Sequence, residues 1–288
     1  MHKAGFVNIF GKPNAGKSTL LNALVGEKLA IISPKVQTTR HRITGIVTEP
    51  GYQIVFSDTP GIIDPRYRLH EKMMGAVKSA LEDADVALLI MDAKDRVEES
   101  LELFDSLKLK VDRILVLNKT DLLQKEELAA LKARCEAWGK APVVAISAMQ
   151  RVGIKELLDR IVALLPEGEP FYPEDTLTDK STRFFVAEII REKIFHLFEE
   201  EIPYHTAVVV SQFQEKQTLV KISAEIIVTR ETQKAIILGE KGKSIRQLGT
   251  LARQDIEKFI GQKVFLELFV KVRGKWRDND TYLREYGY

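Results

Sequence analysis

The sequence GFVNIFGKPNAGKS (residues 5–18) decides the fold, because an apolar run leads through a glycine-containing loop directly into the helix-like STLLNALVG. Glycines let consecutive backbone N–H groups wrap a phosphate chain at the N-terminus of a helix. Lys17 can then reach the terminal phosphates, and the Ser18 hydroxyl can bind Mg²⁺. The stretch therefore predicts a phosphate-binding loop between a strand and a helix, made of Gly11, Lys12, Pro13, Asn14, Ala15, Gly16, Lys17, Ser18 and Thr19.

Strand-like and helix-like patterns alternate from this loop to about residue 165. The runs VALLIM (residues 86–91) and ILVLN (residues 114–118) are almost wholly apolar, which is typical of parallel strands buried on both faces. We therefore predict a first domain over residues 1–165 with a doubly wound α/β fold and a mixed sheet.

The alternation stops at LLPEGEPFYPEDTLTD, where three prolines and acidic clusters predict a linker over residues 166–180. Beyond it we expect a smaller α+β domain over residues 181–288. Its last strand, VFLELFVKV, alternates apolar residues, and we expect its phenylalanines to face mostly the core. The elements predicted for this domain are a helix at 184–201, strands at 206–212, 219–227 and 235–238, a helix at 244–260 and a strand at 264–272.

A second motif, Asp58-Thr59-Pro60-Gly61, ends the predicted strand YQIVFS. An aspartate at this point can hold Mg²⁺ through water, and the Gly61 amide can donate to a γ-phosphate and sense its loss. Taken alone, these four residues would be an ordinary turn. Following a phosphate-binding loop and a strand, they indicate a nucleotide switch.

The base is selected by Asn118-Lys119-Thr120-Asp121, again at the end of a predicted strand. The Asp121 carboxylate can accept both the N1–H and the N2–H₂ of guanine, whereas adenine offers no such pair of donors. Asn118 would brace the loop and Lys119 would lie along the base. After the strand PVVAIS, Ser147 and Ala148 would present a backbone N–H to the guanine oxygen, so we expect GTP and GDP rather than ATP.

These four motifs resemble the Ras-like superfamily of translation-factor-type GTPases. The resemblance implies GTP hydrolysis with Mg²⁺ held by Ser18, Asp58 and a threonine of a mobile loop, switch I. The candidate threonines are Thr38 and Thr39, and we favour Thr39; Gly61 to about Lys72 would form switch II. The residues expected to act at the phosphates during catalysis are Lys17, Asn14, Thr39 and Gly61.

Ile62 departs from this resemblance, because many members place a glutamine directly after DxxG to orient the attacking water. Isoleucine cannot donate or accept a hydrogen bond, so we expect a reaction without that glutamine. In some GTPases with a hydrophobic residue there, a K⁺ ion held by a P-loop asparagine supplies charge at the phosphates, and Asn14 stands at that position. We therefore expect slow intrinsic hydrolysis, stimulated by K⁺ or by a bound partner.

Positive charge is concentrated near the C-terminus. The net charge is +2, yet residues 241–277 contain ten Lys/Arg and three Asp/Glu, against 33 basic and 38 acidic residues elsewhere. The start of this segment lies within Gly239-Glu240-Lys241-Gly242, and a GxxG loop before a helix can approach a nucleic-acid backbone. Trp276 could stack on a base, although packing at the domain edge is the simpler interpretation. The residues expected at RNA are Gly239, Glu240, Lys241, Gly242, Lys243, Arg246, Lys271, Arg273, Lys275, Trp276 and Arg277.

The order of elements around GxxG resembles a KH domain of the type with its extra helix first. Together with the ending VKVRGKWRDND, the whole chain is similar to the Era family of GTPases. That resemblance implies binding to the 3′ end of 16S rRNA and maturation of the small (30S) ribosomal subunit. It also implies a cytoplasmic protein with some association at the inner membrane, and we expect a monomer.

Two other interpretations of the C-terminal domain stay open. It could dock a protein, with the basic stretch serving as a solvated face. It could also bind anionic lipid, although that use would call for a longer basic amphipathic helix than this chain offers.

Composition excludes several other classes. Cys135 is the only cysteine, so the chain forms no intramolecular disulfide and no cysteine-built metal site; LAALKARCEAW predicts a structural thiol on an amphipathic helix. Apolar stretches fall far short of the about 20 residues that cross a bilayer. The N-terminus has no secretory pattern, and we expect a soluble protein.

Overall fold

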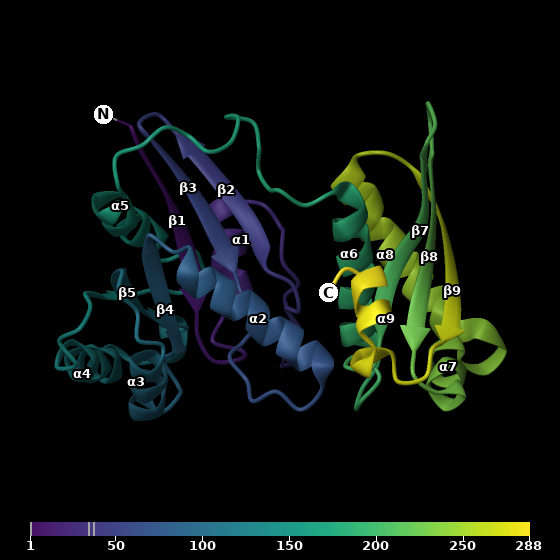
Figure 1. Ribbon diagram of the computed structural model, residues 1–288, viewed down its shortest axis with the longest axis horizontal. Helices are drawn as coiled ribbons and strands as arrows, with labels where there is room; N and C mark the ends of the chain where they lie inside the picture. Colours follow the sequence, from purple (N-terminus) through teal and green to yellow (C-terminus); the bar gives the residue numbers. More distant parts are fainter. Residues whose placement is uncertain (1, 34, 37) are drawn as a thin grey trace. The chain divides into compact units, whose positions relative to one another are not determined.

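The computed structural model describes residues 2–33, 35–36 and 38–288, and the chain divides into two compact units (Figure 1). The first unit contains residues 1–65 and 72–179. The second contains residues 180–288 together with the short segment 66–71. Each unit is built around a sheet of its own. Gln37, which precedes the two candidate threonines in the QTTR stretch, lies outside the described residues.

A six-stranded sheet forms the centre of the first unit, in the order β2-β3-β1-β4-β5-β6. β2 runs antiparallel to β3, and the other neighbouring strands are parallel. The mixed α/β sheet predicted from the sequence is therefore confirmed. The strands are β1 (Lys3–Phe10), β2 (Ile43–Glu49), β3 (Tyr52–Asp58), β4 (Val86–Asp92), β5 (Asp112–Asn118) and β6 (Val143–Ala145).

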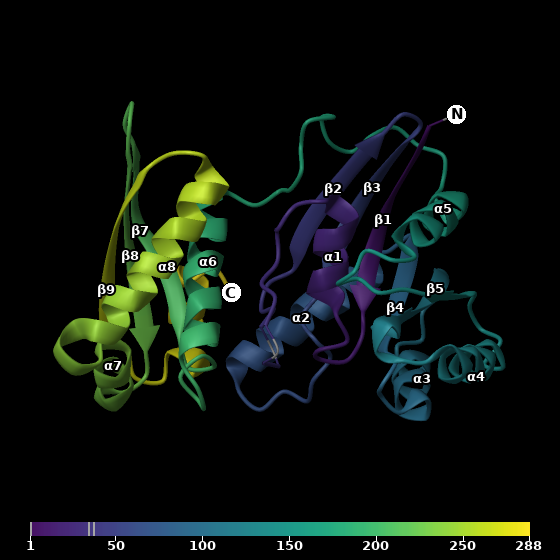
Figure 2. The same ribbon diagram turned by 180° about the vertical axis from the view of Figure 1, so that it is seen from behind.

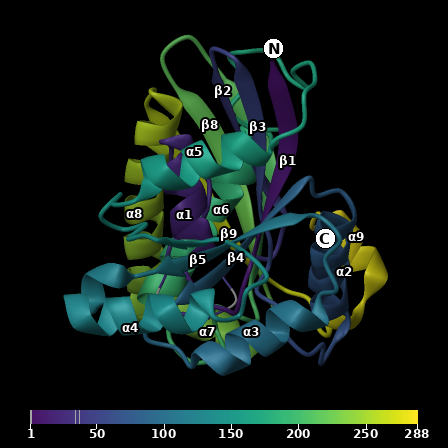
Figure 3. The ribbon, with the colours of Figure 1, turned by 90° about the vertical axis from the view of Figure 1, so that its left-hand side faces the viewer.

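Helices cover both faces of this sheet. α2, α3 and α4 pack on one face around a core that contains Phe104, Leu117 and the fully buried Cys135, which confirms a structural thiol. α1 and α5 lie on the other face (Figure 3). Within the described part of the chain, no helix is both long enough and apolar enough to cross a membrane. The helices are α1 (Lys17–Val25), α2 (Arg68–Glu82), α3 (Val97–Ser106), α4 (Lys125–Glu136), α5 (Ile154–Leu164) and the short η1 (Thr120–Leu122).

The segment after α5, within the predicted linker, packs along the sheet of the first unit. The buried Gln53 side chain accepts hydrogen bonds from the backbone N–H groups of Phe171 and Tyr172, at 2.7 and 2.9 Å. Further along, the Ile46 N–H of β2 donates to the Leu177 carbonyl at 2.8 Å. Residues 166–179 are therefore held as a strap against β3 and β2. Composition alone does not reveal this path, because the strap takes part in these hydrogen bonds mainly through its backbone groups, which every sequence has.

The second unit contains a three-stranded sheet in the order β7-β8-β9, with β7 and β8 antiparallel and β8 and β9 parallel. α6 and α8 lie side by side on one face of it (Figure 2) and share a core with Ile190, Ile226 and Leu248. The elements are α6 (Thr182–Leu197), β7 (Ala207–Glu215), β8 (Val220–Val228), α7 (Glu231–Leu238), η2 (Glu240–Gly242), α8 (Lys243–Ile260), β9 (Val264–Val272), η3 (Trp276–Asp278) and α9 (Asp280–Glu285).

Residues 235–238 end the helix α7, so the prediction of a short strand there is wrong. The buried Gln233 side chain accepts hydrogen bonds from the backbone N–H groups of Thr229 and Arg230, at 3.0 and 3.2 Å, and so closes the first turn of the helix. An apolar run as short as AIIL does not separate a strand from a helix by periodicity. The correction places the GxxG loop between two helices.

The phenylalanines of β9 also differ from expectation. Phe265 and Phe269 are 49% and 50% exposed, whereas Leu266 and Leu268 pack against the core under α6 and α8. Successive strand residues point to opposite faces, so an apolar strand with leucines inside must turn its alternate phenylalanines outward. The prediction that these phenylalanines face the core is wrong.

Candidate functional site

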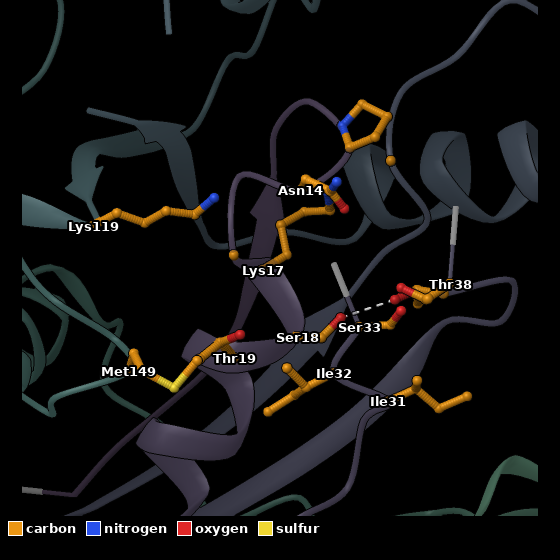
Figure 4. Close-up of a pocket in the computed structure, with 14 residues that line it drawn as sticks. Asn14, Lys17, Ser18, Thr19, Ile31, Ile32, Ser33, Thr38, Lys119 and Met149 are labelled. Carbon is orange, nitrogen blue, oxygen red and sulfur yellow. Dashed lines mark hydrogen bonds between the residues drawn. The ribbon is translucent and has the colours of Figure 1, made fainter. Parts of the chain in front are cut away.

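The phosphate-binding loop joins β1 to α1 at the carboxyl end of the parallel strands, where open α/β sheets hold their ligands. Glycine is required at two places: Gly16 has φ of 99°, and a Cβ on Gly11 would stand 2.3 Å from the Ile90 carbonyl oxygen. Asn14 adopts the left-handed region with φ of 62°, which is uncommon for other residues. The loop borders a cavity of about 410 Å³ (Figure 4), whose other walls come from residues 31–33, Thr38, Thr39, Gly61, Lys119 and Met149.

Lys17 is buried at the floor of this loop. Its Nζ donates to the carbonyl oxygens of Lys12 and Gly11 at 2.9 and 3.2 Å. Burial lowers the pKa of Lys17 to about 8, and the nearby Asp58 carboxylate opposes that shift. Burial removes the water that would stabilise the Lys17 ammonium, and neutral carbonyl groups replace it only in part. A bound anion would stabilise this charge, so Lys17 is a strong site for an anionic ligand.

Three side-chain oxygens converge beside Lys17. Ser18 Oγ donates to Asp58 Oδ2 at 2.6 Å and lies 2.9 Å from Thr39 Oγ1, which donates to the same Asp58 oxygen at 3.2 Å. Burial raises the pKa of the Asp58 carboxyl, and the charge of Lys17 opposes this. Among the residues that the structure describes, Asp58 Oδ1 has no hydrogen-bond partner. A buried carboxylate with an unsatisfied oxygen and two hydroxyls offers the oxygen donors that Mg²⁺ prefers, so these residues fit that ion.

Asn118 braces the loops on the base side of the site. Its Nδ2 donates to the Ala15 carbonyl at 2.9 Å, and its Oδ1 accepts from the Ala148 N–H at 3.0 Å. Asp121 is exposed in η1, directly after Thr120, whose hydroxyl donates to the Ile146 carbonyl at 2.9 Å. The phosphate-binding loop, the NKTD loop and the loop at Ser147 therefore meet at one edge of the sheet.

Two residues that sequence reasoning missed also belong to this region. They are Asp92 and Met149. Asp92 Oδ2 pairs with Lys119 Nζ at 2.6 Å, and Met149 lines the cavity with 71% of its surface exposed. Asp92 lies next to Asn118 in the strand register, so a carboxylate ending the neighbouring strand was a usable signal. Met149 carries no signal beyond its place directly after Ala148.

The residue after DTPG supplies no polar group to the site. Ile62 is partly buried and packs against the core formed by the sheet and α2–α4. A Cβ on the preceding Gly61 would stand 2.9 Å from Cγ of Pro13, so the loop approaches the phosphate-binding loop closely. The structure thus places an apolar contact where many GTPases carry a glutamine.

The GxxG loop of the second unit is a tight turn between α7 and α8. Gly239 and Gly242 have φ of 71° and 75°, and Lys241 between them has φ of 51°. Beside the loop, α8 and β9 form a groove of about 330 Å³. Its lining includes apolar side chains and two arginines, a combination suited to unstacked bases and their phosphates: Ile245, Leu266, Leu268, Arg246 and Arg253.

The structure separates two residues of the basic C-terminal segment from that groove. Trp276 is fully buried, and its Nε1 donates to the His205 carbonyl at 3.1 Å. Trp276 therefore packs in the interior and cannot stack on a base, so the prediction that it binds RNA is wrong. Lys271 alternates with the groove-lining leucines of β9, lies on the opposite face and pairs with Glu225 at 2.5 Å.

The chain matches two family models. Residues 6–119 match the 50S ribosome-binding GTPase family, and residues 201–277 match the KH domain. It is 47% identical over 293 residues to the GTPase Era of Syntrophus aciditrophicus, covering 100% of this chain and 96% of that protein. It is 43% identical over 292 residues to the GTPase Era of Carboxydothermus hydrogenoformans, covering 100% and 98%.

Solved structures of similar proteins agree with this relationship. A crystal structure of Era in complex with MgGDPNP and nucleotides 1506–1542 of 16S ribosomal RNA has a TM-score of 0.96 and 40% identity, covering 100% of this chain and 99% of that one. A variant of Aquifex aeolicus Era bound to GDP and AlF4⁻ has a TM-score of 0.95 and 40% identity, covering 99% of each chain. With more than 40% identity over its full length to curated relatives, this chain belongs to the Era family of GTPases.

Proposed function

We propose that this chain is a Mg²⁺-dependent GTP switch that grips the 3′ end of 16S rRNA through its KH module and acts in assembly of the small ribosomal subunit. The observation that carries the proposal is the presence, in one chain, of a guanine-nucleotide pocket and a GxxG loop between two helices. The RNA-bound relative has the same pair of modules and supports the choice of RNA.

Each residue of the pocket has a defined task in this proposal. The P-loop amides and Lys17 bind the phosphate chain, and Asp121 reads the base. Ser18 and Thr39 would ligate Mg²⁺, and Asp58 would hold it through water. When bound, the ion neutralises charge on the β- and γ-phosphates during transfer to water. Gly61 would donate its amide to the γ-phosphate and lose that bond after hydrolysis.

Hydrolysis in this chain proceeds without a glutamine after DTPG, because Ile62 supplies no hydrogen bond. We assign Asn14 to holding a K⁺ ion that adds positive charge at the phosphates. The left-handed backbone of Asn14 in the loop supports this assignment, since it places a polar residue at a fixed turn beside the cavity.

RNA binding rests on the groove between α8 and β9. Glu240 and Lys241 are exposed in the GxxG turn, and Lys243 and Arg246 follow at the start of α8. The backbone of the loop would approach the phosphates, and the apolar groove would take unstacked bases. We place the protein in the cytoplasm as a monomer, with peripheral contact at the inner face of the membrane.

The test combines nucleotide choice with RNA binding by the full chain. Affinity for GTP should exceed affinity for ATP by several orders of magnitude, and binding of a short single-stranded RNA from the 16S 3′ end should weaken steeply as salt rises. The double substitution Glu240→Asp with Lys241→Asp adds negative charge to the turn and should abolish RNA binding while leaving GTP binding intact. If that variant binds RNA as well as the parent, the C-terminal module docks a protein or another ligand instead.

A further inference from the structure

Arg42 stands directly before β2 and has no task in the function proposed above. Its Nε donates to Ser57 Oγ at 2.9 Å, and both of its terminal nitrogens donate to the Asp83 carboxylate, Nη2 to Oδ1 at 3.0 Å. Ser57 precedes Asp58 in β3, and Thr39 lies three positions before Arg42. We propose that Arg42 is a positioning residue for GTP hydrolysis, which holds Thr39 at Asp58 by fixing the start of β2. This inference rests on the proposed function, because it takes Thr39 as a ligand of Mg²⁺.

Strand pairing brings the partners of Arg42 side by side. Ile43, which follows Arg42, lies opposite Asp58, and Asn8 of β1 lies opposite Ser57. The Arg42 side chain therefore reaches across β3 toward β1, and its Nη2 donates to Asn8 Oδ1 at 3.5 Å. A guanidinium carries its donors in fixed directions, so bonds to two neighbouring strands restrict where the Arg42 backbone can lie.

The carboxylate that receives Arg42 is held at the end of α2. Asp83 directly follows this helix, which lies over the sheet of the first unit (Figure 1). Asn8 is fully buried, and its Nδ2 donates to the Ala80 carbonyl at 2.6 Å and to Asp83 Oδ1 at 2.8 Å. Because a buried amide without partners is costly, these bonds fix both the last turn of α2 and the carboxylate after it.

The Arg42–Asp83 pair differs from an isolated surface salt bridge. The two side chains are 22% and 43% exposed, and a single pair at such a place would hold little in position. This pair is bidentate, and it joins two fully buried polar side chains, Asn8 and Ser57. The start of β2 is therefore set by the seat of α2. Any displacement there passes to Thr39 through only two intervening residues.

The test measures the Mg²⁺ concentration for half-maximal GTPase activity, at saturating GTP, in the full chain and its variants. Arg42→Gln and Asp83→Asn should each raise this concentration about three- to tenfold, because Thr39 is then held less firmly. Both substitutions break the same pair, so the double variant should match the single ones rather than multiply their effects. Arg42→Lys keeps the charge without the bidentate geometry and should recover only part of the loss.

A second measurement separates positioning from general damage to the pocket. Arg42 bonds to β1, β3 and the end of α2 rather than to the phosphate-binding loop. Affinity for GDP in the absence of Mg²⁺ should therefore stay within about twofold of the parent in every variant. Arg160→Gln is the matched control, because it breaks the pair of an exposed arginine with Glu156 on α5 of the same unit. It should change neither quantity.

An unchanged Mg²⁺ requirement in both Arg42→Gln and Asp83→Asn would overturn the inference. Weaker GDP binding without Mg²⁺ would overturn it as well, since the whole pocket rather than Thr39 would then have changed. Multiplied effects in the double variant would show that Arg42 and Asp83 act separately, which also contradicts it. If Thr39→Ala leaves the Mg²⁺ requirement unchanged, the proposed function is wrong about Thr39, and Arg42 has no ligand to position.

Discussion

The Ser18 hydroxyl donates a hydrogen bond of 2.6 Å to Asp58, 40 positions further along the chain. The bond joins the start of α1 to the end of β3, and Thr39 completes the group from the loop before β2. Three segments thus bring their oxygens to one point, which reduces the ordering that Mg²⁺ binding would require.

Thr39→Ala should raise the Mg²⁺ concentration needed for half-maximal GTPase activity, on the order of tenfold, because it removes one of the three converging oxygens. Thr38→Ala is the matched control and should stay within about twofold of the parent. Titration of activity with Mg²⁺ at saturating GTP measures both. A larger effect from Thr38→Ala would transfer the role of Mg²⁺ ligand to Thr38.

Lys17→Met should abolish nucleotide binding and yet stabilise the nucleotide-free protein at pH 7, by roughly 1–3 kcal/mol. Burial lowers the pKa of Lys17 from 10.5 to about 8. Below pH 8 Lys17 is therefore charged in the folded state, where the charged form is less stable than in the unfolded chain, and this lowers the free energy of unfolding. The unfolded chain binds more protons between pH 8 and 10.5, so the penalty fades as pH rises through that window.

Denaturant unfolding at several pH values checks this prediction. The difference in unfolding free energy between parent and Lys17→Met should shrink from pH 8 to pH 10.5. A constant difference across this range would show that desolvation of the ammonium is not its cause.

Gln53→Ala should release the strap formed by residues 166–179. The buried amide accepts from two backbone N–H groups of the strap, and its loss leaves them unpaired at a cost of about 1–3 kcal/mol. Limited proteolysis should then cut within residues 170–176 faster than in the parent. Gln233→Ala removes a similarly buried amide in the second unit and should destabilise without faster cleavage in the strap.

Trp276→Phe should lower stability by about 1–3 kcal/mol, since it removes a hydrogen bond to the His205 carbonyl and leaves a small void. RNA affinity should remain at the parent value, measured by titration at a temperature where both proteins are folded. Weaker RNA binding by the folded variant would return Trp276 to the interface. The Glu240→Asp with Lys241→Asp variant should show the reverse pattern, with normal stability and lost RNA binding.

Sequence patterns located the nucleotide fold well because its motifs are local. The spacing of Gly11, Gly16 and Lys17 reflects backbone requirements of a single turn, and the apolar runs of β4 and β5 report burial on both faces directly. The order of strands and helices could be inferred for the same reason. Residues 235–238 were misassigned because the side chain that closes the α7 helix, Gln233, lies outside the short apolar run.

By itself, the sequence determined a guanine-nucleotide loop system followed by a KH module, since each motif needs only a few residues at fixed spacing. Tertiary structure decided which threonine joins Ser18 and Asp58, which face of β9 carries its phenylalanines, and that Trp276 is buried. It also revealed the Asp92–Lys119 pair and the path of residues 166–179. These features depend on contacts between residues distant in the chain, and spacing along a sequence does not record which side chains fill the same volume.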